Sequence, residues 1–123
     1  MATYVRNGNL GMAVTGGIPK PSIDRASPAY DWLVVRVEMK NYGNAVQHVN
    51  PIAFTASTSN GVTFPLNNRT YYYTDRFQAV DLPPGGTTFG WLIFDIPWDT
   101  THYLNYSLGG VTMKKTVHIY AFQ

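Results

Sequence analysis

Few side chains in this sequence could act as acids, bases, nucleophiles or metal ligands. The chain has no cysteine, one glutamate (Glu38) and three histidines, His48, His102 and His118. The histidines fall on different expected segments without an H-x-x-x-H spacing, and no serine lies in a G-x-S-x-G sequence. Two routes to a metal site remain: convergence of the histidines in space, or a hard cation such as calcium on Asp95 and Asp99, although aspartates at a strand end and a turn more commonly have capping roles. We therefore expect a protein that is not an enzyme, with no catalytic residue, no metal and no cofactor.

Aromatic residues are the one enriched class of side chain that could bind a ligand, and they make up 15% of the chain. Exposed tyrosine and tryptophan rings stack on sugar rings and anchor protein contacts. The alternative is that most of these rings pack in the core or on sheet surfaces, because strands favour aromatic residues. The candidate aromatic binding residues are a consecutive run expected in a strand, Tyr71, Tyr72 and Tyr73, together with Trp98 and Tyr103 near the loops.

A second candidate site is an apolar face shared by two expected strands. The segment 87–96 is apolar at both parities, which is typical of a strand covered on both faces. If its outward side lies beside that of the segment 32–40, a contiguous apolar patch results. The chain itself could cover this patch with residues 10–15 or the proline-rich loop; otherwise another subunit or a ligand contacts it. The candidate interface residues are Trp32, Val34, Phe89, Trp91 and Ile93.

The composition of the chain limits the kinds of fold that can position these side chains. A chain of 123 residues suits one domain. Charged residues make up 13% of the chain, about half the usual ~25%. The chain also contains 11 Gly, 8 Pro and 9 Tyr, and this composition favours an all-β fold. A hydrophobic content of 45% excludes disorder, and no apolar run is long enough for a membrane span. The net charge is only +2 and the nine Lys and Arg residues are scattered along the chain, so we expect no nucleic-acid partner.

Turn signals divide the chain into short strands without a helical period. The clearest strand is 32–40, where Leu33, Val35, Val37 and Met39 alternate with more polar residues. Residues 18–28 contain three prolines and are predicted to form a loop. The other predicted strands are 3–6, 10–15, 52–56, 62–64, 87–96, 103–108 and 111–122, which is the spacing of an antiparallel sandwich.

Several of these segments together resemble a known family. They are Asn7-Gly8-Asn9-Leu10, Trp32-Leu33-Val34-Val35-Arg36-Val37, the turn Leu82-Pro83-Pro84-Gly85, and Gly90-Trp91-Leu92-Ile93-Phe94-Asp95-Ile96-Pro97. The pattern resembles the immunoglobulin-like domain of prokaryotic surface lipoproteins and secreted antigens, a family of unknown function with the sandwich fold of the secreted mycobacterial immunoprotective antigen. The resemblance implies that fold and an exported setting, and it brings no catalytic residues. No signal peptide or lipobox is found in these residues, so the exported setting rests on the resemblance alone.

The expected protein is thus a single immunoglobulin-like antiparallel β-sandwich of about seven to nine strands over residues 3–122. We expect a non-catalytic extracellular or cell-surface module for binding or adhesion, with a protein partner or self-association and no membrane span. One alternative is a structural subunit of a filament or virion, which would explain the low charge and the apolar face. A second alternative is a carbohydrate-binding module that stacks its aromatic residues on a glycan.

Overall fold

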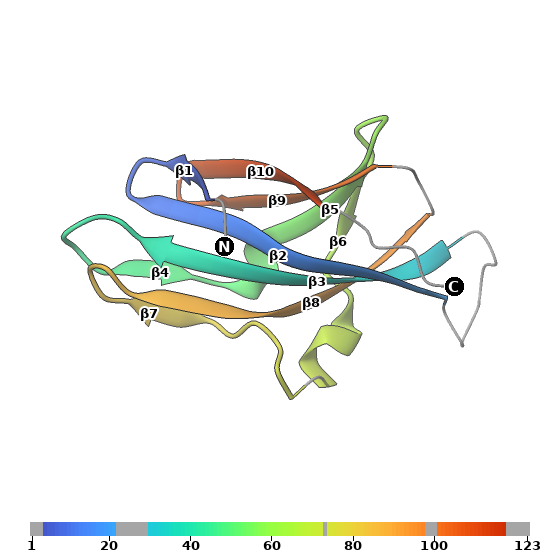
Figure 1. The fold of residues 1–123 in the computed structure, drawn as a ribbon, viewed down its shortest axis with the longest axis horizontal. Helices are drawn as coiled ribbons and strands as arrows, with labels where there is room; N and C mark the ends of the chain where they lie inside the picture. Colours follow the sequence, from blue (N-terminus) through green and yellow to red (C-terminus); the bar gives the residue numbers. More distant parts are fainter. Residues whose placement is uncertain (1–3, 22–29, 73, 98–100, 118–123) are drawn as a thin grey trace.

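Two antiparallel four-stranded sheets pack face to face in the computed structural model, which describes residues 4–21, 30–72, 74–97 and 101–117 (Figure 1). One sheet has the order β1-β2-β3-β8 and the other β10-β9-β5-β6, while β4 and β7 form a separate pair. Two 3₁₀ helices, η1 (Pro51–Ala53) and η2 (Asn68–Tyr72), complete the described elements. The strands are β1 (Val5–Asn7), β2 (Leu10–Pro21), β3 (Tyr30–Asn41), β4 (Gln47–Val49), β5 (Phe54–Thr58), β6 (Thr63–Pro65), β7 (Val80–Leu82), β8 (Thr87–Pro97), β9 (His102–Leu108) and β10 (Val111–Val117).

The expected immunoglobulin-like antiparallel sandwich is confirmed, with ten strands among the described residues where about seven to nine were predicted. The two additional short strands, β4 and β7, lie in segments that the sequence left without structure. Residues 118–122 of the expected domain lie outside the described residues. None of the helices in the described part of the chain has the length and hydrophobicity to cross a membrane.

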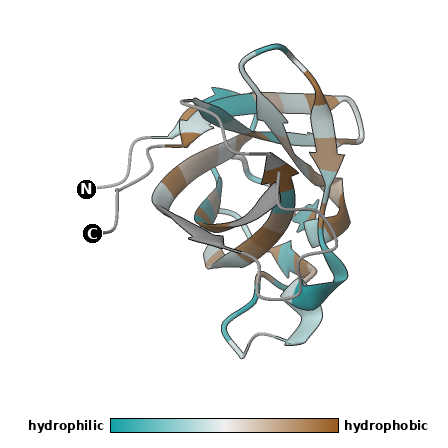
Figure 2. Cartoon of the chain, turned by 90° about the vertical axis from the view of Figure 1, so that its right-hand side faces the viewer, coloured by the Kyte–Doolittle hydropathy of each residue, from teal (hydrophilic) through white to brown (hydrophobic). Residues whose placement is uncertain are grey.

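The core lies between the two sheets and is built by alternation along the strands. The alternate residues of β3 that the sequence predicted to lie on one side of the strand are buried, as are the inward-facing residues of β8. Figure 2 shows hydrophobic residues interrupted by more hydrophilic ones along the strands that enclose this core. Three aromatic rings pack together in this core: Phe54 stands edge-on to Tyr106 at 4.8 Å and to Phe77 at 5.2 Å between centroids.

β8 hydrogen-bonds on both of its edges. On one side it pairs with β3 from Tyr30↔Pro97 to Lys40↔Thr87. On the other side, the chain around η2 supplies the partners. The Thr70 hydroxyl accepts from Ile93 N at 3.0 Å, and Phe77 N donates to Trp91 O at 3.0 Å. Both edges of the most apolar strand are therefore satisfied.

Two predicted segments differ in the structure, each for a local reason. Ile18–Pro21 continues β2 past a bulge at Val14/Gly16, where a loop was predicted. Tyr71 and Tyr72 lie in η2 and not in a strand, because Asn67 caps this turn: its side chain accepts from Arg69 N at 2.8 Å and its carbonyl from Thr70 N at 3.0 Å.

A third prediction was wrong at the start of β5. Residues 52 and 53 belong to η1, where the Asn50 side chain accepts from Ile52 N at 3.1 Å and Pro51 occupies the first position. As a consequence, Ile52 points outward and is 72% exposed instead of continuing the alternation of Phe54 and Ala56.

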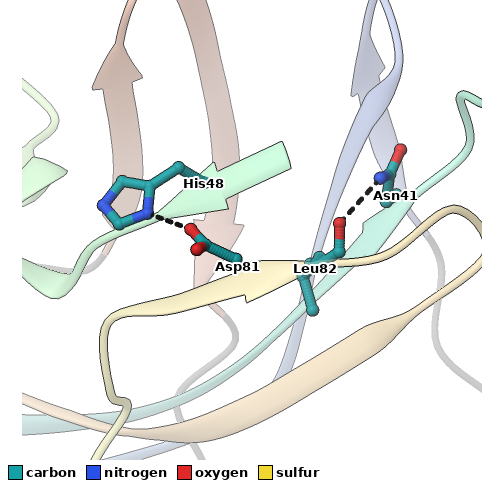
Figure 3. A network of polar contacts seen from close by, with 4 residues as sticks. All are labelled: Asn41, His48, Asp81 and Leu82. Carbon is teal, nitrogen blue, oxygen red and sulfur yellow. Dashed lines mark hydrogen bonds and ion pairs between the residues drawn. The ribbon is translucent and has the colours of Figure 1, made fainter. Parts of the chain in front are cut away.

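The Asn41 side chain links the end of β3 to β7 from a fully buried position. Its Nδ2 donates to Leu82 O at 3.0 Å (Figure 3) and to Ala45 O at 2.7 Å, and its Oδ1 accepts from Gly43 N at 2.9 Å. Every polar atom of this amide thus has a partner, and the amide holds the turn after β3 against the β4–β7 pair.

Replacing Asn41 by alanine should therefore destabilise the fold by roughly 2–4 kcal/mol, because Leu82 O loses a partner in a buried place and Gly43 N loses one in a partly buried place. Urea denaturation measures this loss. Asn44→Ala in the exposed part of the same turn is the matched control and should change the unfolding free energy by less than about 0.5 kcal/mol. Equal losses in the two variants would contradict the role given to Asn41.

Gly90 allows the closest backbone approach along β8. A Cβ at this position would collide with the backbone of Phe77, a segment that cannot retreat because it bonds to Trp91. Gly90→Ala should cost about 2 kcal/mol or more in urea denaturation. Gly16→Ala is the control, since its Cβ would meet only Arg36 and Trp91 side-chain atoms at 3.7 and 3.8 Å; a similar loss there would refute the steric explanation.

Candidate functional site

The outward side of the β1-β2-β3-β8 sheet carries aromatic rings interleaved with cations. Register explains the gathering: Val34 pairs with Ile93, Arg36 with Trp91 and Glu38 with Phe89, and paired residues share a face. We call this surface the aromatic–cation face. It is made by Tyr4, Arg6, Arg36, Glu38, Lys40, Tyr42, Phe89 and Trp91.

One half of this face is centred on Phe89, which is 59% exposed. The Arg36 guanidinium lies over its ring at 4.4 Å from the centroid and is held there by a 2.8 Å hydrogen bond to Thr15 Oγ1. Trp91 is half-buried, and the position of a Cβ on Gly16 would lie 3.8 Å from its indole, so the ring extends across β3 towards β2. A large apolar area is thus presented beside an ordered cation.

The other half is centred on Tyr42. Arg6 lies over its ring at 4.0 Å and Lys40 at 5.1 Å, and Tyr4 meets it edge-on at 5.9 Å between centroids. The Tyr4 hydroxyl donates to the Glu38 carboxylate. Among its described side chains the face has three cations, Arg6, Arg36 and Lys40, and one carboxylate, so it is predominantly positive.

The five predicted interface residues do not share one environment in the structure. Phe89 and Trp91 are available on the aromatic–cation face, whereas Val34 and Ile93 are 3% and 0% exposed and already covered by the protein itself. The backbone of Trp32 pairs with Asp95, and its side chain lies outside the described residues. The suggested cover, residues 10–15, is instead a strand in the same sheet. Sequence reasoning missed the cations that accompany the rings, although the parity of Arg36 with Val34 was a signal for them.

The five predicted aromatic binding residues do not form one site. Tyr71 and Tyr72 lie on η2, 48% and 86% exposed, while Tyr103 lies on β9 of the opposite sheet with Lys114 Nζ 4.3 Å from its ring centroid (Figure 1). Tyr73 and Trp98 lie outside the described residues. Only the tyrosines of η2 therefore remain together as candidates.

A pocket of about 340 Å³ adjoins η2, and we call it the η2 pocket. Phe77, which is 1% exposed, and the buried Pro51 supply its apolar walls. Its volume is at the lower end of the range for small-molecule sites. The lining residues are Asn50, Pro51, Tyr71, Arg76, Phe77, Gln78 and Ala79.

The histidines do not converge where the structure describes them. His48 Nδ1 lies 2.6 Å from Asp81 Oδ1 on the surface of the β4–β7 pair (Figure 3), and His102 is buried on β9. His118 lies outside the described residues. Within the described ranges, no three His, Asp or Glu side chains are grouped so that they could hold a metal ion.

The Tyr4–Glu38 contact should make stability pH-dependent in alkaline solution. Burial and then the hydrogen bond to Glu38 raise the pKa of Tyr4 well above its ordinary value. An unfolded tyrosine ionises near pH 10, so this stabilisation is complete below about pH 10 and is lost as the pH rises further. Denaturation between about pH 9 and 11 should show a steeper loss for the unchanged protein than for Tyr4→Phe. The exposed Tyr72→Phe control should keep the original slope, and a common slope in all three would contradict this assignment.

Solved structures of bacterial proteins share this fold. The "putative lipoprotein" ycdA of Bacillus subtilis superposes with a TM-score of 0.73 at 18% identity over 95% of this chain. The chain spans only 38% of ycdA. The secreted protein MPT63 of Mycobacterium tuberculosis gives 0.66 at 15% identity over 92% of this chain and 88% of its own. The yjhA protein of Bacillus subtilis gives 0.64 at 19% identity, covering 85% and 76%.

Sequence comparison is consistent with these structures. No curated protein matches the chain. A family model does match, over residues 3–117, which is nearly the whole sequence and includes every described strand. This range also contains the segments on which the resemblance was based. The chain belongs to the DUF4352 family, a domain of unknown function.

Proposed function

We propose that this domain is a non-catalytic binding module, exported or displayed at the cell surface, which uses the aromatic–cation face to bind an acidic protein partner. The observation that carries the proposal is Phe89, a large ring left 59% exposed near the start of β8, the last strand of its sheet, with Arg36 ordered over it. Aromatic and arginine side chains dominate the energetics of protein interfaces.

The ordering of these side chains favours binding. Arg36 is held by Thr15, and Arg6 is held over Tyr42. Side chains that already occupy a restricted set of positions lose less entropy when a partner arrives. The Phe89 ring and the flank of Trp91 can then act as apolar anchors, with guanidinium groups beside them to pair with carboxylates.

Charge favours an acidic partner over a second copy of the chain. Among its described side chains the face presents three cations, Arg6, Arg36 and Lys40, against the one carboxylate of Glu38. A symmetric contact between two copies would place the same cations opposite one another, which is unfavourable. A partner rich in Asp and Glu would meet complementary charge.

The exported setting is supported by the fold relatives. One carries the printed description "putative lipoprotein" and another is a secreted protein.

Photocrosslinking in the native host tests this function. A benzophenone amino acid at position 89 should give one discrete adduct with an acidic protein, and the same probe at the exposed Ser107 on β9 should not. Arg36→Glu should abolish the adduct through charge repulsion. Comparable adducts from both positions, or an adduct with twice the mass of the chain, would contradict the proposal.

Once the partner is purified, the contribution of single side chains to the affinity can be measured. Phe89→Ser should weaken binding by about 30-fold or more, the usual effect of losing an interface anchor. Thr112→Ser on β10 is the exposed control and should bind as the unchanged protein does. Titration calorimetry provides both values, and equal affinities for the two variants would exclude Phe89 as an anchor.

A further inference from the structure

We propose that the aromatic–cation face recognises an extended acidic segment of its partner in which two carboxylates lie four residues apart, at positions i and i+4. This inference rests on the proposed function and specifies the segment that such a face would select. It follows from the order of charges along β3 (Figure 1), where Arg36, Glu38 and Lys40 alternate with buried residues and therefore point outward together.

The charges on the outward side of β3 are positive, negative and positive in that order. Alternate residues of a strand repeat at about 6.7 Å, so Arg36 and Lys40 lie about 13 Å apart along the strand, with Glu38 between them. An extended partner segment has the same repeat, whereas residues i and i+4 of a helix are separated by only about 6 Å. Carboxylates at i and i+4 of an extended segment can therefore meet both cations, while an acidic residue at i+2 would be repelled by Glu38.

A ring holds the cation at the first end of this row. Arg36 lies over Phe89 at 4.4 Å from the ring centroid, and its Nη1 donates to Thr15 Oγ1 at 2.8 Å. Neither contact neutralises the guanidinium, because a phenylalanine ring and a hydroxyl carry no net charge. A guanidinium has five N–H donors at its planar edge, so stacking and one hydrogen bond leave donors for a carboxylate. Arg36 is therefore ordered and still able to bind.

Two cations share one ring at the other end of the row. The Tyr42 ring centroid lies 4.0 Å from the Arg6 guanidinium and 5.1 Å from Lys40 Nζ. Gly11 makes room for this ring, since a Cβ at that position would lie 2.5 Å from Tyr42 Cε2. The contacts described for both cations are with an uncharged ring, and Arg6 is exposed while Lys40 is half-buried. Their charge is thus left for a partner.

The backbone fixes the distance between the two ends. β3 lies inside its sheet and pairs with β2 on one edge and β8 on the other, so Arg36 and Lys40 cannot move apart or together without breaking the sheet. A preformed spacing allows discrimination between acidic segments of equal net charge, because only a matching segment satisfies both cations. The face should therefore select the positions of carboxylates and not only their number.

Synthetic peptides of one composition test this spacing. Each contains two glutamates among serines and threonines, placed at i and i+2, at i and i+4, or at i and i+6. The i, i+4 peptide should bind at least about 5-fold more tightly than the other two, since it alone reaches both cations. NMR titration of the isotope-labelled domain at low salt, where exposed ion pairs are least screened, gives the affinities and shows which face is contacted.

Variants identify the side chains that select the spacing. Lys40→Gln should abolish the preference for the i, i+4 peptide. Gly11→Ala should weaken the preference without any change of charge, because the added Cβ displaces Tyr42. Lys114→Gln, on β10 of the opposite sheet, loses the same charge as Lys40→Gln and is the matched control. Should Gly11→Ala fail to fold, Lys40→Gln and the peptide series still decide.

Glu38→Gln should produce a change in the opposite direction. A peptide with a third glutamate at i+2 should bind the unchanged domain more weakly than the i, i+4 peptide, although it carries more negative charge. In Glu38→Gln this difference should diminish, because the facing carboxylate has been removed. A third glutamate that strengthens binding to the unchanged domain would contradict the role given to Glu38.

Equal affinities for the three spacings would overturn the inference, since they would show attraction to net charge alone. An unchanged preference in Lys40→Gln would do the same, as would tighter binding of a helical peptide with glutamates at i and i+8. Crosslinking at position 89 tests the proposed function separately. A discrete acidic adduct combined with no spacing preference would leave the binding face in place and remove only the extended segment.

Discussion

The need to satisfy both edges of β8 determines much of this structure. A strand that is apolar at both parities cannot leave its amides exposed at the edge of a sheet, because such an edge recruits other strands. Here β3 closes one edge and the chain around η2 closes the other through Thr70 and Phe77. Gly90 allows this second closure, since the backbone of Phe77 occupies the space of a side chain.

The same strand serves both candidate sites. The side chains of Phe89 and Trp91 belong to the aromatic–cation face, while the backbone of Trp91 holds the residues that flank Arg76 in the η2 pocket. The structure also shows where some of the few charged residues of this chain lie. The cations of the outward sheet are laid over rings, as Arg36 is over Phe89, so that few charges give an ordered positive surface.

The sequence predicted what periodicity can encode. β3 was found because its eleven consecutive pairs with β8 impose alternation on it, and β8 was found because it is a long run that is apolar at both parities. β4 and β7 have three residues each, too few positions to show a period. Pro19 and Pro21 suggested a loop, yet both missing amides lie at alternate positions of β2, beyond the stretch that pairs with β1, where no donor is required. The grouping of Arg6 and Tyr42 depends on tertiary contacts and could not be derived from spacing.

The long pairing of β3 with β8 has a consequence for how the domain acquires its structure. β2 and β3 are neighbours in the chain and can pair as soon as both have been synthesised, but β8 comes after β4, β5, β6 and β7. Because pairings between distant segments form slowly, the β3–β8 pair is completed late. The pairing of β2 with β3 should therefore precede the closure of this sheet by β8.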